Sequence, residues 1–157
     1  MVPAEKLVSF LLLNNKEADI EYVSSLVDYY TEEAALEYIN HDIAYAQMCL
    51  ETGFLTFGGL VTFEMNNFCG LGATGPQEAG LSFSDPRTGV RAHIQHLKAY
   101  ATSEPLNLFL VDPRYRFVKH GFYPTILGLA GTWAADRAYS DKITLILKRL
   151  YAFSFDK

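Results

Sequence analysis

The stretch that decides the fold runs from Asn40 to Gly75 and reads NHDIAYAQMCLETGFLTFGGLVTFEMNNFCGLGATG. Its first part carries apolar residues at helical spacing, and its acidic residues are Asp42 near the start and Glu51 at the end. The remainder is rich in glycine and asparagine, which is typical of loops. The stretch therefore predicts a largely buried helix that ends on one carboxylate beside a loop.

Glu51 is the residue that this arrangement brings forward as a candidate. At helical spacing it shares a face with Ala44, Gln47 and Met48. Apolar neighbours disfavour an ionised carboxylate and raise its pKa, which is the change that a general acid needs near neutral pH. The alternative is a glutamate that points into water at a helix end, as most do. Spacing alone leaves both interpretations open.

Composition limits the class of protein. The chain has 157 residues, half of them apolar, and a net charge of -5, which together predict one folded domain over residues 1–157. Lys148-Arg149 is the longest basic run, so nucleic acid is not expected as a partner. The two cysteines, Cys49 and Cys69, are expected to be small buried apolar residues.

Targeting signals are not evident in the sequence. The apolar run from Leu7 to Leu13 is too short to span a bilayer, and neither a basic flank nor a small-residue cleavage pattern accompanies it. We expect it to form a core helix. Localisation must therefore be inferred from the substrate. The protein is expected to be a monomer.

Helical periodicity dominates the rest of the chain. The helix start and stop signals predict helices over residues 4–13, 17–30, 31–38, 40–51 and 85–101, a short one from Pro124 to Gly128 or Gly131, and a last one from Ser140. Asp85-Pro86 has the pattern of an N-cap followed by proline in the first turn. The chain is therefore expected to be mainly α-helical.

One lobe departs from this pattern. Between Gly53 and Ser84 lie seven glycines without a helical stripe, and Leu60 to Phe63 favour at most a short strand or hairpin. Gly70, Gly72 and Gly75 spell GxGxxG, but the strand and helix that a dinucleotide site requires are missing around them. These glycines are better explained by tight turns or by close approach of a ligand.

Other polar and aromatic residues have structural and functional interpretations. His93 and His96 have the spacing of two metal ligands, but no third ligand is evident, so hydrogen-bonded structural histidines are favoured. His41-Asp42 lacks the nucleophile of a catalytic triad. Trp133 and Tyr139 fit a core or a platform for the apolar face of a sugar ring.

Four blocks of the sequence resemble the glucosaminidase family of peptidoglycan hydrolases. They are INHDIAYAQMCLETGFLTFGG (39–59), NNFCGLGATG (66–75), GVRAHIQHLKAYA (89–101) and WAADRAY (133–139), and they follow in the order of that family. The resemblance implies a lysozyme-like helical fold and cleavage of the β-1,4 bond after N-acetylglucosamine in glycan strands. It also implies a location in the cell envelope.

The resemblance also assigns roles to residues. Glu51 matches the catalytic acid of the family, and Tyr139 matches a tyrosine that positions water or the transition state. The substrate-binding residues that it implies are Gln47, Asn66, Asn67, Phe68, Gly70 and Trp133. Arg137 stands where the family often has proline, which affects the placement of Tyr139.

A second catalytic carboxylate is not identified by any motif. Glu64, Glu78 and Asp85 are candidates because all three lie in or beside the glycine-rich lobe. If none of them approaches the bond, the N-acetyl group of the substrate takes that part. No metal or organic cofactor is expected, since proton transfer and charge stabilisation suffice for glycoside cleavage. The alternatives are a lytic transglycosylase on the same fold and a non-catalytic wall-binding module.

Overall fold

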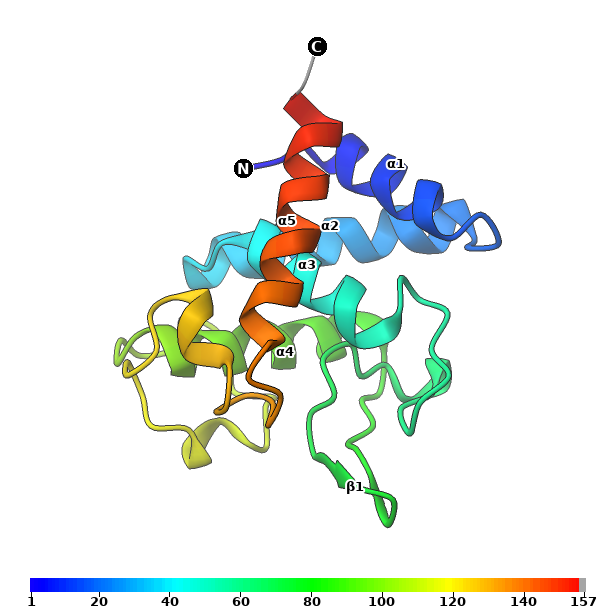
Figure 1. Ribbon diagram of the computed structural model, residues 1–157. Coiled ribbons are helices and arrows are strands. Elements are labelled where there is room, and N and C mark those ends of the chain that lie inside the picture. Colours follow the sequence, from blue (N-terminus) through cyan, green and yellow to red (C-terminus); the bar gives the residue numbers. More distant parts are fainter. Residues whose placement is uncertain (156–157) are drawn as a thin grey trace.

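The structure is a computed structural model, and it describes residues 1–155 of the chain (Figure 1). Within these residues lie five α-helices, three short 3-10 helices and one two-stranded antiparallel hairpin. The α-helices are α1 (Ala4–Asn14), α2 (Ile20–Glu37), α3 (His41–Thr52), α4 (Pro86–Ala101) and α5 (Tyr139–Phe155). The 3-10 helices are η1 (Phe63–Met65), η2 (Tyr115–Phe117) and η3 (Ile126–Leu129), and the strands are β1 (Ala73–Gly75) and β2 (Glu78–Ala79). The expected mainly helical fold with a short hairpin lobe is confirmed.

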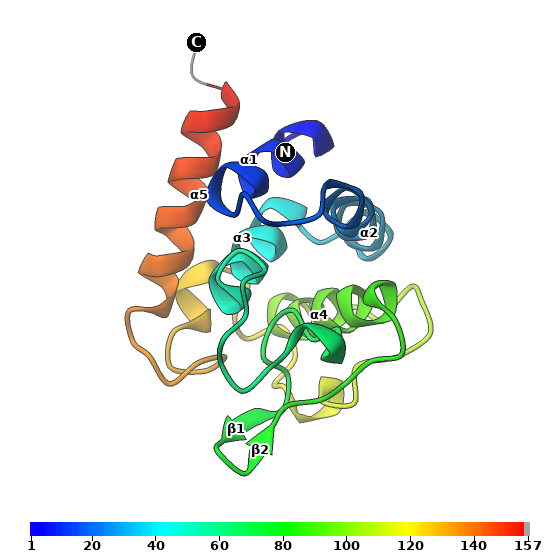
Figure 2. The same cartoon turned by 90° about the vertical axis from the view of Figure 1, so that its right-hand side faces the viewer.

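The core lies where α3 meets the other helices. Leu7 of α1, Val27 of α2, Tyr45 of α3 and Ile143 of α5 are fully buried in one apolar cluster. Figures 1 and 2 show α1 and α2 at one end of the molecule and the hairpin at the other, with α4 between them. Burial of α3 within this core follows from its nearly uncharged sequence. The expectation for both cysteines is also confirmed, because Cys49 and Cys69 are buried.

Local signals set the starts of three helices. The side chains of Asp19 and Asn40 accept hydrogen bonds from the backbone N–H groups of Tyr22 and Asp42, at the starts of α2 and α3. Asp85 accepts from the N–H of Thr88, and Pro86 occupies the first turn of α4, as the sequence predicts. These caps satisfy N–H groups that have no partner inside the helix.

Two expectations about secondary structure are wrong. The predicted break at Thr31 does not exist, because α2 is continuous and the Thr31 hydroxyl donates to the carbonyl of Asp28 within the helix. Leu60 to Phe63 form no strand; Leu60 and Phe63 are about half exposed, and the hairpin lies at residues 73–79 instead. Strand propensity did not decide the structure there because the segment has no partner strand to pair with.

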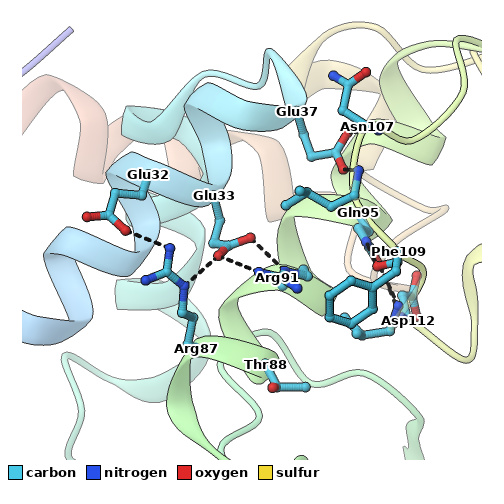
Figure 3. Close-up of polar contacts among 12 residues, drawn as sticks. Glu32, Glu33, Glu37, Arg87, Thr88, Arg91, Gln95, Asn107, Phe109 and Asp112 are labelled. Atoms are coloured by element: carbon cyan, nitrogen blue, oxygen red, sulfur yellow. Dashed lines mark hydrogen bonds and ion pairs between the residues drawn. The ribbon is translucent and has the colours of Figure 1, made fainter.

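A buried carboxylate joins α2 to α4 (Figure 3). Glu33 is fully buried and accepts two hydrogen bonds from Arg91, at 2.8 and 3.0 Å, and one from Arg87 at 2.8 Å. Burial alone would raise the pKa of Glu33, but the two guanidinium groups outweigh it and lower that pKa. The pairing fixes the orientation of α4 against α2.

A second buried pair fixes the far end of the same interface. Lys98 of α4 donates to Glu37 of α2 at 2.7 Å, and the carboxylate of Glu37 also accepts from the backbone N–H groups of Asn107 and Leu108 at 3.0 Å each. Gln95 adds three bonds to the same segment, with the carbonyl of Phe109 and the N–H groups of residues 111 and 112 (Figure 3). The loop region that follows α4, residues 102–138, is therefore anchored on α4.

Removing the charge of Lys98 is expected to destabilise the fold strongly. In Lys98→Met the aliphatic volume is retained, but the buried Glu37 carboxylate loses its counter-charge, so the free energy of unfolding should fall by about 3 to 5 kcal/mol. The control is Lys142→Met, whose partner Asp136 lies on the surface, and its effect should stay below ~1 kcal/mol. Urea unfolding measures both, and equal effects would contradict the prediction.

Candidate active site

A cleft of about 530 Å³ lies between the two loop regions. One wall is formed by Cys69 to Thr74 of the hairpin lobe (residues 53–84), and the other by residues between 114 and 133. His96 and Tyr100 of α4 also line it, so the helix lies at its base. Figures 1 and 2 show the hairpin and η2 at the same end of the molecule, below α4, while η3 lies at the level of the helices.

Glu51 lies in the last turn of α3, next to this cleft. More than a third of its surface is open to solvent, yet the surrounding protein desolvates its carboxyl group and raises its pKa. The hydrogen bond from the Tyr139 hydroxyl acts in the opposite direction and lowers that pKa in part. The negative end of the α3 dipole opposes ionisation as well. Glu51 is therefore accessible to solvent and also biased towards its protonated form. The sequence had suggested either a buried acid or a solvent-exposed glutamate, and Glu51 has features of both.

Hydrogen bonds connect Glu51 to three other helices through buried side chains. The Tyr139 hydroxyl of α5 donates to Glu51 and accepts from the amide of Gln47 at 2.8 Å. The carbonyl oxygen of Gln47 lies 2.9 Å from Nε2 of His93 in α4, and Nδ1 of His93 lies 2.9 Å from the Tyr30 hydroxyl of α2. The four residues behind Glu51 are at most 5% exposed.

With the Gln47 amide donating to Tyr139, these hydrogen bonds have one consistent arrangement of protons. Burial lowers the pKa of His93 to about 3, so the ring is neutral and carries one proton. Since Gln47 offers its carbonyl oxygen, the proton must be on Nε2, and Nδ1 then accepts from Tyr30. Gln47 donates to Tyr139, which leaves the Tyr139 proton for Glu51. If the oxygen and nitrogen of the Gln47 amide changed places, the Tyr139 hydroxyl would donate to Gln47, and the Glu51 carboxylate would lose this donor.

Gly70 leaves the other oxygen of Glu51 accessible. A Cβ atom at Gly70 would lie 3.4 Å from Oε2 of Glu51, and the backbone there is left-handed with φ of +70°. Gly70 also lines the cleft. Tyr139 bonds Oε1, so Oε2 is the oxygen that this hydrogen bond leaves free, and it lies beside Gly70 at the edge of the cleft.

Asn67 holds the hairpin lobe together from inside. Its amide donates to the carbonyls of Leu71 and Leu81 at 2.9 Å each, and its carbonyl accepts from the N–H groups of Leu71 at 3.1 Å and Cys69 at 3.4 Å. Asn67 is 1% exposed. Its side chain is therefore occupied by the loop backbone that carries Gly70.

The other expected binding residues are divided between loop and cleft. The amide of Asn66 donates to the carbonyl of Phe83 at 3.0 Å, and Phe68 is fully buried in the core. Trp133 is half-buried and lines the cleft, where it packs against His96 with ring centroids 4.8 Å apart. Binding of substrate remains a prediction for all six residues, of which Gly70 and Trp133 line the cleft; Gln47, Asn67 and Phe68 are buried, and Asn66 bonds the loop backbone.

The three candidates for a second carboxylate lie in different surroundings. Asp85 caps α4 and also accepts from the hydroxyls of Ser84 and Thr88. Glu78 is exposed on β2 and bonded to Thr74, and Glu64 is exposed on η1. None of the three lines the cleft, and Glu51 borders it only through Gly70.

Both expected structural histidines have hydrogen-bond partners. His93 belongs to the chain described above, and His96 bonds Asp112 at 2.7 Å through Nδ1. Among residues 1–155, no group of three or more potential metal ligands is assembled. Spacing within the sequence did not reveal Tyr30 or Asp112, because their partners lie 63 and 16 residues away.

None of the helices among residues 1–155 combines the length and the apolar character that crossing a membrane requires.

The helices, the small hairpin and the carboxyl group at the end of α3 define a lysozyme-like helical domain. The chain belongs to the glucosaminidase family, described as mannosyl-glycoprotein endo-β-N-acetylglucosaminidase, which it matches over residues 27–152. It is also 46% identical over 150 residues to an uncharacterized protein of Borreliella burgdorferi, covering 96% of this chain and 74% of that protein. Family membership supports a glycoside hydrolase that acts on N-acetylglucosaminyl bonds.

Replacing Asn67 is expected to loosen the hairpin lobe. In Asn67→Ala, four hydrogen bonds to the backbone are lost and three backbone groups keep no partner, since the Leu71 carbonyl still accepts from the N–H of Leu81; the free energy of unfolding should fall by about 1 to 3 kcal/mol. Asn107→Ala is the control, since that side chain donates one bond, to the exposed carbonyl of Leu36. Chemical denaturation gives the stabilities, and hydrogen exchange of residues 69–81 should accelerate only in the first variant. Unchanged exchange there would contradict the role of Asn67.

Proposed function

We propose that this protein is a peptidoglycan hydrolase that cleaves the β-1,4 bond after N-acetylglucosamine. Glu51 is the general acid, and Tyr139 positions its carboxyl group. The cleft beside Gly70 receives the glycan strand. The proposal places the protein in the cell envelope, as a monomer without a cofactor.

The position of Glu51 carries this proposal. Its carboxyl group has a raised pKa, its Oε1 is bonded by Tyr139, and its Oε2 borders a glycine that lines the cleft. A general acid requires these properties, because it must be protonated before the reaction and accessible to the leaving oxygen. Family membership supplies the class of bond.

In the proposed reaction, Oε2 of Glu51 donates its proton to the glycosidic oxygen as the bond to the anomeric carbon breaks. The Glu51 carboxylate that forms is stabilised by the Tyr139 hydroxyl, whose hydrogen bond strengthens once its acceptor is charged. Positive charge develops on the ring of the N-acetylglucosamine as this bond breaks, water then bonds to the anomeric carbon, and the proton that the water loses restores the acid form of Glu51. Asp85 is engaged in capping α4, Glu78 is bonded to Thr74, and Glu64 is exposed on η1, so we favour assistance by the N-acetyl group of the substrate over a fixed second carboxylate.

Two other functions fit part of the same geometry. A lytic transglycosylase also uses one glutamate, and it leaves a 1,6-anhydro sugar where a hydrolase leaves a reducing N-acetylglucosamine. A wall-binding module would retain strands without releasing fragments. Mass spectrometry of the soluble products from sacculi separates the three, and an anhydro product or none would reject hydrolysis.

Glu51→Gln is expected to abolish cleavage without harming the fold. Loss of the general acid should lower kcat by about 10² to 10⁴-fold. Glutamine can still accept from Tyr139 and has no ionisation to suppress, so the free energy of unfolding at neutral pH should not decrease. Release of soluble fragments and urea unfolding measure the two effects.

Glu21→Gln is the matched control for this variant. Glu21 is exposed in the first turn of α2, so its replacement should leave both quantities unchanged. Near-normal release of fragments by Glu51→Gln would reject the proposed role of Glu51.

Tyr139→Phe is expected to move the pH profile. The Tyr139 hydroxyl lowers the pKa of Glu51, so its removal should raise that pKa further above its ordinary value. Activity requires protonated Glu51 and is lost as pH rises through this pKa. The alkaline limb of kcat/KM should therefore shift to higher pH, with a lower maximum because the carboxylate formed in the reaction loses its donor.

Tyr151→Phe serves as the control on the same helix, since its hydroxyl bonds Asp42 at 3.2 Å and not Glu51. Its alkaline limb should match that of the wild type. A limb in Tyr139→Phe that stays in place or moves to lower pH would contradict the assigned hydrogen bond.

A further inference from the structure

One wall of the cleft is positively charged in an acidic protein. The segment from Pro113 to Tyr123 contains Arg114, Arg116 and Lys119 and no Asp or Glu, whereas the chain as a whole has a net charge of -5. Asp112, just before it, is 1% exposed and bonded to His96, so its carboxylate is turned into the protein. The basic residues are exposed.

Two of these three residues face the cleft. Arg114 and Lys119 line it together with Gly70 and Trp133, while Arg116 does not. No Asp or Glu side chain is part of this lining. The positive charge is therefore directed at whatever occupies the space beside Glu51.

Neighbouring aromatic rings hold these cations without neutralising them. The guanidinium of Arg114 lies 5.2 Å from the ring centre of Phe117, and the ammonium of Lys119 lies 3.8 Å from that of Phe122. Within residues 1–155, neither Arg114 nor Lys119 forms an ion pair with Asp or Glu. Such groups remain able to bind an anionic ligand, at a small cost in side-chain entropy because stacking restricts them.

We infer that Arg114 and Lys119 bind carboxylate groups on the glycan, so that the cleft selects acidic strands over neutral polymers of N-acetylglucosamine. This inference rests on the proposed function. Muramoyl residues alternate with N-acetylglucosamine in such strands and carry either a free lactyl carboxylate or a peptide with carboxylates of its own. Because Gly70 borders both Glu51 and the cleft, the selected carboxylate lies on a sugar close to the bond that is cleaved.

The kinetic test compares Arg114→Gln/Lys119→Gln with Arg116→Gln on soluble glycan strands. An exposed ion pair contributes up to about a fivefold change in affinity, so the double variant should raise KM by about 5- to 20-fold and leave kcat within about twofold. Arg116→Gln should behave as the wild type, because its side chain lies outside the cleft lining. High salt should reduce the difference by screening.

Chemical changes to the strand identify the carboxylate. Strands whose carboxyl groups have been amidated should raise the KM of the wild type to that of the double variant, and the double variant should not discriminate between the two substrates. An effect confined to peptide-free strands assigns the lactyl carboxylate, and one confined to peptide-bearing strands assigns the peptide. Equal KM values for the wild type and double variant on both kinds of strand would overturn the inference.

A binding experiment separates this inference from the proposed function. In the Glu51→Gln background, co-sedimentation with intact sacculi should weaken when Arg114 and Lys119 are also replaced, and not when Arg116 is. If Glu51→Gln retains turnover, the proposed function fails while the binding comparison still decides about the basic wall. If binding is identical in all three variants, the basic wall has no part in recognition even though cleavage by Glu51 stands.

Discussion

The rest of the structure depends on the buried hydrogen-bond chain from Tyr30 through His93, Gln47 and Tyr139 to Glu51. Each link comes from a different helix except for Gln47 and Glu51, which share α3, so the chain forms only when α2, α3, α4 and α5 are all in place. Polar groups buried this deeply must be hydrogen-bonded, because burying one without a partner lowers the stability of the fold by more than one good hydrogen bond raises it. The core is therefore specified by the same bonds that orient the candidate acid.

The two loop regions around the cleft are stabilised differently. The hairpin lobe depends on Asn67, one side chain that bonds backbone groups at both ends of the loop, and on Gly89 of α4, where a Cβ atom would clash with the carbonyl of Asn66. The opposite region is bound to α4 by Gln95 and His96 and to α2 by Glu37. Both walls thus take their positions from α4, which the Glu33 and Glu37 ion pairs fix against α2.

The sequence predicted those features whose cause is local. The start of α4 at Asp85-Pro86 depends on neighbouring residues, and so do the apolar periodicity of α3 and the glycine-rich lobe. The break predicted at Thr31 was wrong because α2 continues through Glu33 and Glu37. These two residues are buried and paired with α4 residues more than 50 positions away, which the local sequence does not reveal. The meeting of Glu51 with Tyr139, 88 residues later, followed from family resemblance and not from spacing.

The backbone just after α3 adopts the left-handed conformation, which residues other than glycine rarely adopt. Gly53, Phe54 and Leu55 are consecutively left-handed, with φ of 57°, 55° and 64°, although bulky side chains disfavour this conformation. The Phe54 ring packs on Phe10 of α1 at 5.9 Å, and its carbonyl accepts from the amide of Asn15 at 2.8 Å. If α3 moved along its axis, Glu51 would move towards or away from a bound sugar. The same movement would break the contacts of Phe54 with Phe10 and Asn15. An apolar contact with the first helix, at the end of the molecule opposite the hairpin, therefore also resists movement of the carboxyl group along the α3 axis.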